Sequence, residues 1–234
     1  MKEKLKEEIK SFSPFWKGGT TRPKLGWSKM TKGGSVDEIA IYEDCIKDFV
    51  TEDSNVLEIG CGGGFWTQKF LHANTFVGLD ALSAEHNHFW ERVPRKDGFQ
   101  YFQVEDFQCN ELKDNSIDYL FSYDVFCHIS YSGCREYLKN LYPKLKNDAK
   151  CFIMIADRDK YSNQEGLNRL MSRTRHENLK DFLDDYDGPP ENGRWYFYGI
   201  GKFCKLLEEF GYKLILKDAT LHSDKFNPTI YFKK

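Results

Sequence analysis

Two patterns of hydrophobic residues alternate along this chain, one typical of strands and the other typical of helices. Runs rich in apolar residues, which are typical of strands, lie at 55–59, 75–79, 99–104, 115–123 and 151–156. Between these runs, apolar residues stand three or four positions apart, which is typical of amphipathic helices. Such spacing occurs at 5–12, 39–49, 65–71, 134–145, 167–174, 179–183 and 203–210. The alternation predicts an α/β fold with a mostly parallel sheet and helices on both faces.

Local signals mark where some of these elements begin and end. Ser35 and Glu38 have the spacing of a capping box before the helix at 39–49. Gly211 follows the helix at 203–210 as a C-terminal stop. Two further apolar runs, at 213–217 and 229–232, predict a final pair of strands that form a hairpin. We therefore expect a single domain over residues 1–234.

Two segments are longer than this core requires. Residues 1–34 form an N-terminal arm, and residues 157–199 separate the fifth predicted strand from the final helix. A connection of the second length is uncommon in a compact domain unless it has a function. Because ligands of open α/β sheets bind at the carboxyl ends of the strands, we expect residues 157–199 to form a lid over that edge. The arm, with Trp16, Arg22 and Trp27, is expected to cover the same ligands.

Composition narrows the classes of function. The chain has 234 residues, a formal net charge of −2 and seven cysteines. Nearly balanced charge gives no general attraction to nucleic acid. No apolar stretch is long enough to span a membrane, and the charged N-terminus lacks the apolar core of a signal peptide. Cysteines 61, 127 and 151 lie in or beside apolar runs, so we expect reduced core thiols in a cytoplasmic protein.

A glycine cluster follows the first predicted strand. Glycines let the backbone turn sharply and approach a ligand closely. Asp80 ends the second predicted strand about twenty residues later, where an acid can accept hydrogen bonds from ribose hydroxyls. A dinucleotide fingerprint requires a third glycine at position 65, which is Phe65 here, and the phosphate-binding loop G-x-x-x-x-G-K-[ST] is absent. The pattern present is E-x-G-x-G-x-G, formed by Glu58, Gly60, Gly62 and Gly64.

This pattern resembles motif I of the class I S-adenosylmethionine-dependent methyltransferases, and residues 115–123 resemble that family's fourth-strand segment. The resemblance implies a Rossmann-like, doubly wound sheet of seven strands whose last strand runs antiparallel at one edge. It also implies S-adenosylmethionine as the cofactor. Asp80 would contact the ribose, Asp106 the adenine amine, and Phe107 would pack on the adenine ring. The other cofactor-binding residues implied are Glu58, Gly60, Gly62 and Gly64.

The residues that act on the methyl acceptor are harder to assign. Methyl transfer from a sulfonium is an in-line displacement, in which an acceptor hydroxyl must lose its proton and an amine needs only to be neutral. His128 follows the fourth strand and is the first candidate for the base, with Tyr123 on the same strand end as the second. A purely orienting or packing role for His128 stays open. Histidines 72, 86 and 88 are expected at the surface.

The predicted lid carries the candidate substrate-binding residues. Arg169 and Arg173 could bind a phosphate or carboxylate, because a guanidinium binds two oxygens at once. Trp195 and Tyr198 could contact the apolar face of a sugar or ring. The two arginines also stand four residues apart on a predicted helix, so a solvated helix face remains the alternative.

These observations favour methyl transfer to a small polar metabolite, at a hydroxyl of a sugar or phosphorylated compound. An N-methyltransferase acting on a small amine or amino sugar is the alternative. Nucleic acid is not expected as a substrate, because no Asn/Asp-Pro-Pro-aromatic run follows the fourth strand. A nicotinamide-dependent oxidoreductase and a non-catalytic cofactor-binding subunit remain possible from other classes. We expect no metal, because Asp124, Asp157 and Asp159 have no diagnostic spacing.

Overall fold

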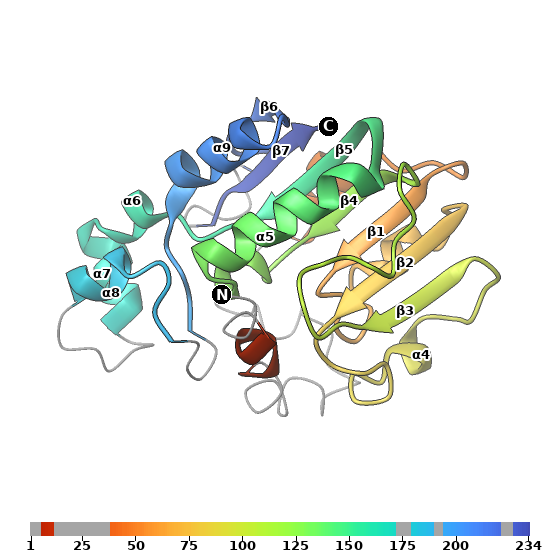
Figure 1. Cartoon of the computed structure of the whole chain (residues 1–234), viewed down its shortest axis with the longest axis horizontal. Helices are drawn as coiled ribbons and strands as arrows, with labels where there is room; N and C mark the ends of the chain where they lie inside the picture. Colours follow the sequence, from red (N-terminus) through yellow and green to blue (C-terminus); the bar gives the residue numbers. More distant parts are fainter. Residues whose placement is uncertain (1–5, 12–37, 172–178, 190–193, 221–226) are drawn as a thin grey trace.

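A seven-stranded sheet forms the centre of the structure, a computed structural model that describes residues 6–11, 38–171, 179–189, 194–220 and 227–234 (Figure 1). Of residues 169–171 it describes only the backbone. The strands stand in the order β3-β2-β1-β4-β5-β7-β6, and β7 runs antiparallel to both of its neighbours. Their bounds are β1 Asn55–Ile59, β2 Thr75–Asp80, β3 Phe99–Gln103, β4 Ile117–Ser122, β5 Leu145–Met154, β6 Lys213–Leu216 and β7 Thr229–Lys233. The predicted fold class is confirmed.

Helices of very different length connect the strands. The short helix α3 (Glu38–Ile41) continues into the π-helix η1 (Tyr42–Ile46), and residues 6–11 are also helical. The 3₁₀ helices are η2 (Thr67–Phe70), η3 (Phe126–His128) and η4 (Tyr142–Lys144). The remaining α-helices are α4 (Phe89–Arg92), α5 (Tyr131–Leu141), α6 (Arg158–Tyr161), α7 (Gln164–Met171), α8 (Leu179–Asp184) and α9 (Gly199–Glu209).

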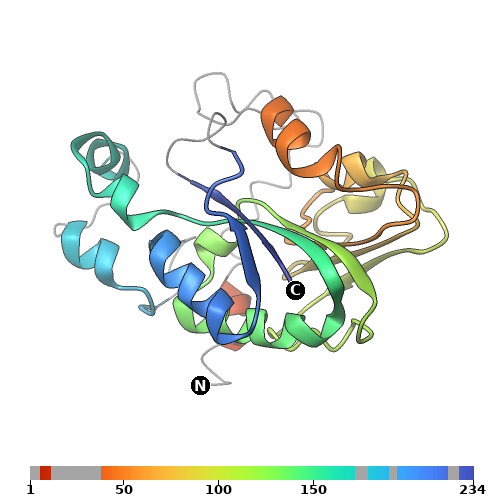
Figure 2. The same cartoon turned by 90° about the horizontal axis from the view of Figure 1, so that it is seen from above.

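Both faces of the sheet are buried, as the apolar runs predict. Successive strand residues point to opposite faces, so Cys151 and Ile153 join one core while Phe152 and Met154 join the other. The first core lies under α5 and α9, and the second lies under α3 and η1. Figure 2 shows these two sets of helices on opposite sides of the sheet. The sheet is therefore a rigid platform whose strand ends can position a site.

Three predicted details are wrong. The antiparallel strand β7 lies between β5 and β6, so β6 is the edge strand. Leu145, assigned by its spacing to a helix, begins β5, because Pro143 in η4 ends the helical stretch. The segment after the glycine cluster forms turns and η2 in place of a longer helix. Here the buried aromatic contacts of Phe70 with Phe76 and Phe121 hold the segment against the sheet.

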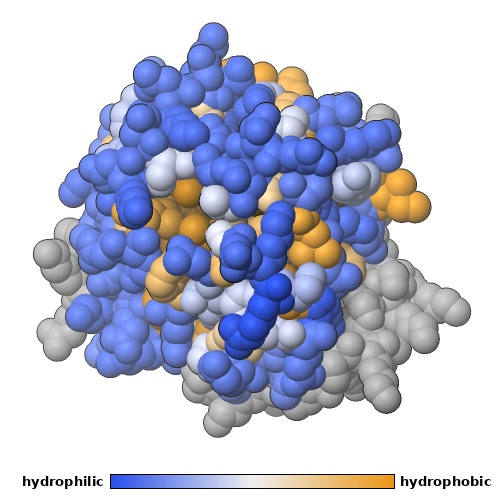
Figure 3. All heavy atoms as spheres, turned by 90° about the vertical axis from the view of Figure 1, so that its right-hand side faces the viewer, coloured by the Kyte–Doolittle hydropathy of each residue, from blue (hydrophilic) through white to orange (hydrophobic). Residues whose placement is uncertain are grey.

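The face of the molecule beside β3 and the other strands at the right of Figure 1 is mainly polar. Figure 3 shows the face on the right-hand side of Figure 1, where hydrophilic side chains surround small apolar patches. No helix among the described residues is long and apolar enough to cross a membrane.

Candidate active site

The glycine loop after β1 is tightly packed at two positions and open at a third. Gly60 has a φ of 72°, and a Cβ built there would lie 2.1 Å from Cγ2 of Val125. A Cβ at Gly64 would similarly lie 2.3 Å from Cγ2 of Val93. Gly62 has a φ of 49°, but a Cβ there would meet nothing within 4 Å. The loop therefore packs against its neighbours through Gly60 and Gly64 and presents open space at Gly62, where a ligand can approach the backbone.

Alanine at Gly60 and alanine at Gly62 should lower the stability of the protein by different amounts. We expect Gly60→Ala to lower the free energy of unfolding by roughly 2–4 kcal/mol, because it combines left-handed backbone strain with a clash against Val125. Gly62→Ala should cost about 1 kcal/mol, since only the backbone strain applies there. Its methyl group should instead weaken cofactor binding by occupying the open space. Urea unfolding and cofactor titration measure the two effects, and equal losses of stability would contradict the packing argument.

Two acids stand on neighbouring strands beside this loop. The carboxylate of Asp80 accepts hydrogen bonds from the backbone N–H of Gly62 at 2.8 Å and of Leu82 at 2.9 Å. Burial raises the pKa of the Asp80 carboxyl, although these hydrogen bonds oppose the rise. Glu58 is only 2 % exposed and accepts a hydrogen bond from the Thr67 hydroxyl at 2.6 Å. Asp80 therefore joins the end of β2 to the glycine loop, as the prediction of a shared cofactor site requires.

Glu58 should make the stability of the protein depend on pH. Burial raises the pKa of its carboxyl from 4.5 to about 8. Between these values the folded protein retains a proton that the unfolded chain releases, so the contribution of Glu58 to stability falls as pH rises. Glu58→Gln keeps an acceptor for Thr67 and removes the titration, so it should flatten this part of the profile. Urea unfolding at several pH values measures this, and identical profiles for the two proteins would refute the shifted pKa.

The two residues proposed for the adenine lie in different environments. Asp106 is half-buried, and its carboxylate accepts a hydrogen bond from the backbone N–H of Gln108 at 2.9 Å. The ring of Phe107 is 2 % exposed and packs against Tyr137 of α5 at 4.9 Å between ring centroids. Asp106 thus remains a candidate for the adenine amine, whereas the position of Phe107 in the core disfavours its predicted packing on the ring.

One histidine near this site was misplaced by the sequence argument. His72 and His88 are exposed, as expected, but His86 is half-buried. Its Nε2 is buried and has no hydrogen-bond partner among the described residues. The imidazole is close enough to Asp80 to offset part of the rise that burial causes in the pKa of that carboxyl. Since no periodicity or motif marks His86, only the fold of the segment after β2 brings it to the cofactor side.

The candidate base His128 has a defined orientation in η3. It is 4 % exposed, and its Nδ1 lies 3.1 Å from the backbone oxygen of Arg194. A carbonyl oxygen only accepts, so Nδ1 carries the proton of the neutral ring and Nε2 holds the lone pair. Tyr123 is buried beyond the end of β4, with its ring 5.5 Å from that of Trp66. His128 therefore has the tautomer that a base needs.

Residues 194–198 lie along η3 and hold it in place. The backbone N–H of Tyr196 donates to the oxygen of Cys127 at 2.7 Å, and the Tyr198 hydroxyl donates to the oxygen of Phe126 at 2.9 Å. Tyr198 is 3 % exposed, so its ring and hydroxyl serve the core, which disfavours the predicted substrate contact. Trp195 is half-buried, with its ring 5.5 Å from that of His128, and remains a candidate.

The other parts of the predicted arm and lid are only partly described. Arg173, Trp16, Arg22 and Trp27 lie outside the described residues, and Arg169 is described only as backbone in α7. Within residues 6–11, the buried Glu8 accepts hydrogen bonds from the backbone N–H and hydroxyl of Ser130, the N-cap of α5. The start of the arm therefore docks at the N-terminus of α5, two positions after His128 in the chain.

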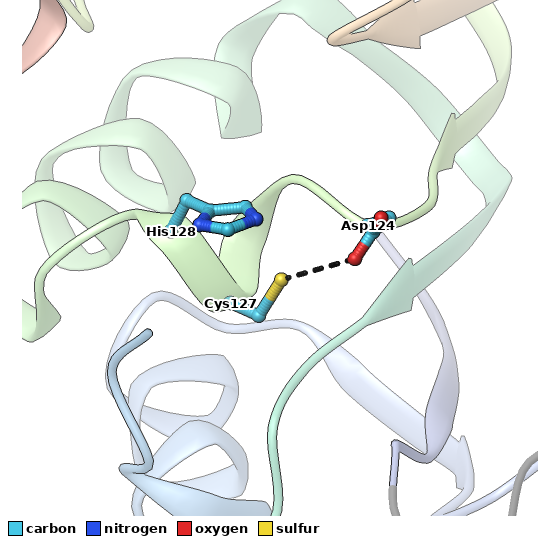
Figure 4. A group of neighbouring side chains, drawn as sticks. All are labelled: Asp124, Cys127 and His128. Carbon is cyan, nitrogen blue, oxygen red and sulfur yellow. Dashed lines mark hydrogen bonds between the residues drawn. The ribbon is translucent and has the colours of Figure 1, made fainter. Parts of the chain in front are cut away.

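A third group of side chains gathers at the end of β4. Asp124, Cys127 and His128 offer ligand atoms that all lie within 4.8 Å of one another (Figure 4). Cysteines 61, 127 and 151 are buried, as expected. The sequence prediction of no metal did not consider a cluster that combines a carboxylate, a thiol and an imidazole. The signal that could have found it is the spacing Asp-x-x-Cys-His in the turn after a strand.

Comparison with known proteins decides the family. The sequence profile of the methyltransferase domain matches residues 39–217. The chain belongs to the methyltransferase domain family. The predicted family, its enzyme class and its methyl donor, S-adenosylmethionine, are confirmed by this match together with the fold. No curated protein matches the chain in sequence.

Solved structures of other methyltransferases share the fold. A magnesium protoporphyrin IX methyltransferase from Synechocystis, with bound SAH, has a TM-score of 0.60 and 13% identity, covering 97% of this chain and 99% of its own. A SAM-dependent methyltransferase from Aquifex aeolicus has a TM-score of 0.54 and 18% identity, covering 89% and 98%. The N-methyltransferase NodS from Bradyrhizobium japonicum has a TM-score of 0.55 and 12% identity, covering 84% and 93%.

The residues of this methyltransferase fit its donor. The open space at Gly62 lies beside the carboxylate of Asp80, which can accept hydrogen bonds from ribose hydroxyls through lone pairs that its two backbone contacts leave. Asp106 follows β3, the neighbour of β2, which is where the prediction places the contact to the adenine amine. This arrangement fits a donor site over β1, β2 and β3 (the donor half) and an acceptor site beside His128 at the end of β4 (the acceptor half).

Proposed function

We propose that this methyltransferase transfers the methyl group of S-adenosylmethionine to a hydroxyl of a small polar metabolite, such as a sugar or a phosphorylated compound. The observation that carries this proposal is the orientation of His128. Its Nδ1–H donates to the carbonyl of Arg194, which directs the basic Nε2 away from that contact. A hydroxyl acceptor needs such a base, whereas a neutral amine does not.

Each residue of the site has a simple part in this reaction. Asp80 and the open backbone at Gly62 hold the donor, whose sulfonium supplies the methyl group. The side chains of Trp195 and Tyr161, 6.2 Å apart between ring centroids, keep the space beside His128 poor in water. The bound donor would supply the methyl group and leave as a neutral thioether, and Nε2 of His128 would take the proton of the acceptor hydroxyl. Tyr123 is the second candidate for the proton acceptor.

An anionic group on the acceptor would need a cation close to His128. Arg194 contacts His128 through its backbone oxygen, but its half-buried side chain pairs with Asp185 at 2.8 Å and lies over the rings of Phe182 and Tyr196. We therefore assign Arg194 to the structure of the lid. An anionic group of the acceptor would depend on Arg169 and Arg173, which remain a prediction from the sequence.

Methylation of a small amine is the alternative, because one of the solved structures with this fold is the N-methyltransferase NodS. Incubation with isotope-labelled S-adenosylmethionine and matched pairs of sugars, in which a hydroxyl replaces an amine, tests the choice. We expect label in the hydroxyl compounds, with a rate that rises with pH through the titration of His128. Label only in the amines would support the alternative, and label in none of these compounds would exclude sugars and amino sugars as acceptors.

A further inference from the structure

The turn after β4 brings together three side chains that are commonly metal ligands. Asp124 follows the strand, and Cys127 and His128 belong to η3. Their ligand atoms all lie within 4.8 Å of one another, and the thiol of Cys127 lies 3.6 Å from the carboxylate of Asp124. Figure 4 shows the three side chains facing the same space.

These distances are close to those around a bound zinc ion. Zinc binds thiolate sulfur at about 2.3 Å and imidazole nitrogen at about 2.0–2.1 Å in a tetrahedral arrangement. Two such ligand atoms therefore lie roughly 3.3–3.8 Å apart. The contact between Cys127 and Asp124 already has this length. The other distances among the three ligand atoms are at most 4.8 Å, which is somewhat longer than this spacing.

The surroundings of the cluster also have the form of a metal site. Metal-binding histidines usually donate their second ring N–H to a carbonyl or carboxylate, which fixes the tautomer. Nδ1 of His128 donates to the carbonyl of Arg194 in this way, so Nε2 is the nitrogen that would bind the ion. The hydrogen bond from the Tyr196 backbone N–H to the Cys127 oxygen holds the same turn. Asp124 has a φ of 60°, an uncommon backbone conformation that the turn maintains.

The three side chains differ in burial, so one side of the site is shielded from water and another faces solvent. Cys127 is fully buried and His128 is 4 % exposed, so a bound cation would be shielded from water on that side. Asp124 is half-buried and provides the approach from solvent. Three protein ligands leave a fourth position open, as in zinc sites that bind water or a substrate. Thiolate and imidazole favour zinc-type ions over magnesium or calcium, which prefer oxygen ligands.

We propose that Asp124, Cys127 and His128 form a binding site for a zinc-type divalent cation at the acceptor end of the sheet. Binding displaces the thiol proton of Cys127 to solvent and uses the lone pair on Nε2 of His128. That lone pair cannot hold the ion and take the acceptor's proton at the same time. The proposal does not rest on the proposed hydroxyl acceptor, and its test needs no acceptor.

Cobalt(II) is a direct probe of the ligands, because a cobalt–thiolate bond gives a charge-transfer absorption in the near ultraviolet. The whole protein is stripped with a chelator, dialysed and titrated with cobalt(II), then with zinc(II). We expect one cobalt per chain, d–d bands of tetrahedral coordination, a thiolate band and loss of both on addition of zinc. Calorimetry in buffers of different ionisation enthalpy should show a proton released on binding.

Variants assign the signal to the cluster. Cys127→Ser should abolish the thiolate band, and Asp124→Asn should weaken cobalt binding at least tenfold while retaining that band. Cys204→Ser removes a half-buried thiol of α9 and is the matched control, which should change nothing. A thiolate band that survives Cys127→Ser but disappears in Cys204→Ser would overturn the proposal. The absence of one-to-one binding to the unaltered protein would overturn it as well, whether or not the variants fold.

Discussion

Replacing Asp80 by alanine should weaken the binding of S-adenosylmethionine by roughly 10- to 100-fold. A hydrogen bond to a charged group contributes about 1.5–3 kcal/mol, and each 1.4 kcal/mol is a factor of ten in affinity. Asp80 is expected to accept hydrogen bonds from the ribose, and it also accepts one from the backbone N–H of Gly62. The variant therefore loses a direct contact and the restraint on the glycine loop together. Isothermal titration calorimetry with the donor measures the effect.

A second substitution at the same position separates these two losses. Asp80→Asn keeps one acceptor oxygen, so it should retain part of the loop restraint and weaken binding less than alanine. Asp53→Ala, at an exposed position before β1, is the control for removal of a carboxylate and should leave the affinity unchanged. Thermal unfolding of each variant confirms that the sheet is intact. Unchanged affinity in a folded Asp80→Ala protein would show that Asp80 makes no contact with the donor.

Replacing His128 by alanine should lower the turnover of a hydroxyl acceptor by roughly 100- to 1,000-fold, within the usual range for loss of a general base. The affinity for S-adenosylmethionine should stay within about twofold, since His128 stands at the end of β4 and the donor half lies over β1, β2 and β3. In the unaltered enzyme, activity should fall at low pH as Nε2 takes up a proton. This acidic limb should disappear in the variant.

The matched control for this experiment is His72→Ala, which removes an exposed imidazole. All reactions are run with a chelator present, so that a bound cation cannot change the result. Full activity of His128→Ala with a hydroxyl acceptor would remove His128 as the base and leave Tyr123 as the candidate. A variant that loses donor affinity together with turnover would indicate a structural role for the histidine.

The sequence by itself determined the class of fold and the proximity of the glycine cluster to Asp80. Strand-like runs and helix-like spacing are local properties, and they reproduce six of the strands closely, the partly exposed edge strands β3 and β6 included. The glycine cluster and Asp80 lie at the carboxyl ends of neighbouring parallel strands, so their proximity follows from the topology alone. Each of these features depends on residues that are near in the chain or connected by one strand pairing.

Only the tertiary structure decided the environment of individual side chains in the acceptor half. Tyr198 and Trp195 stand three positions apart in one aromatic run, yet one serves the core and the other contacts His128. The bonds that orient His128 and anchor Glu8 join segments 66 and 122 residues apart. Such pairings depend on how loops pack on the finished sheet, and no local spacing encodes them. The same packing brings the carboxylate, thiol and imidazole of η3 and its preceding turn to one point.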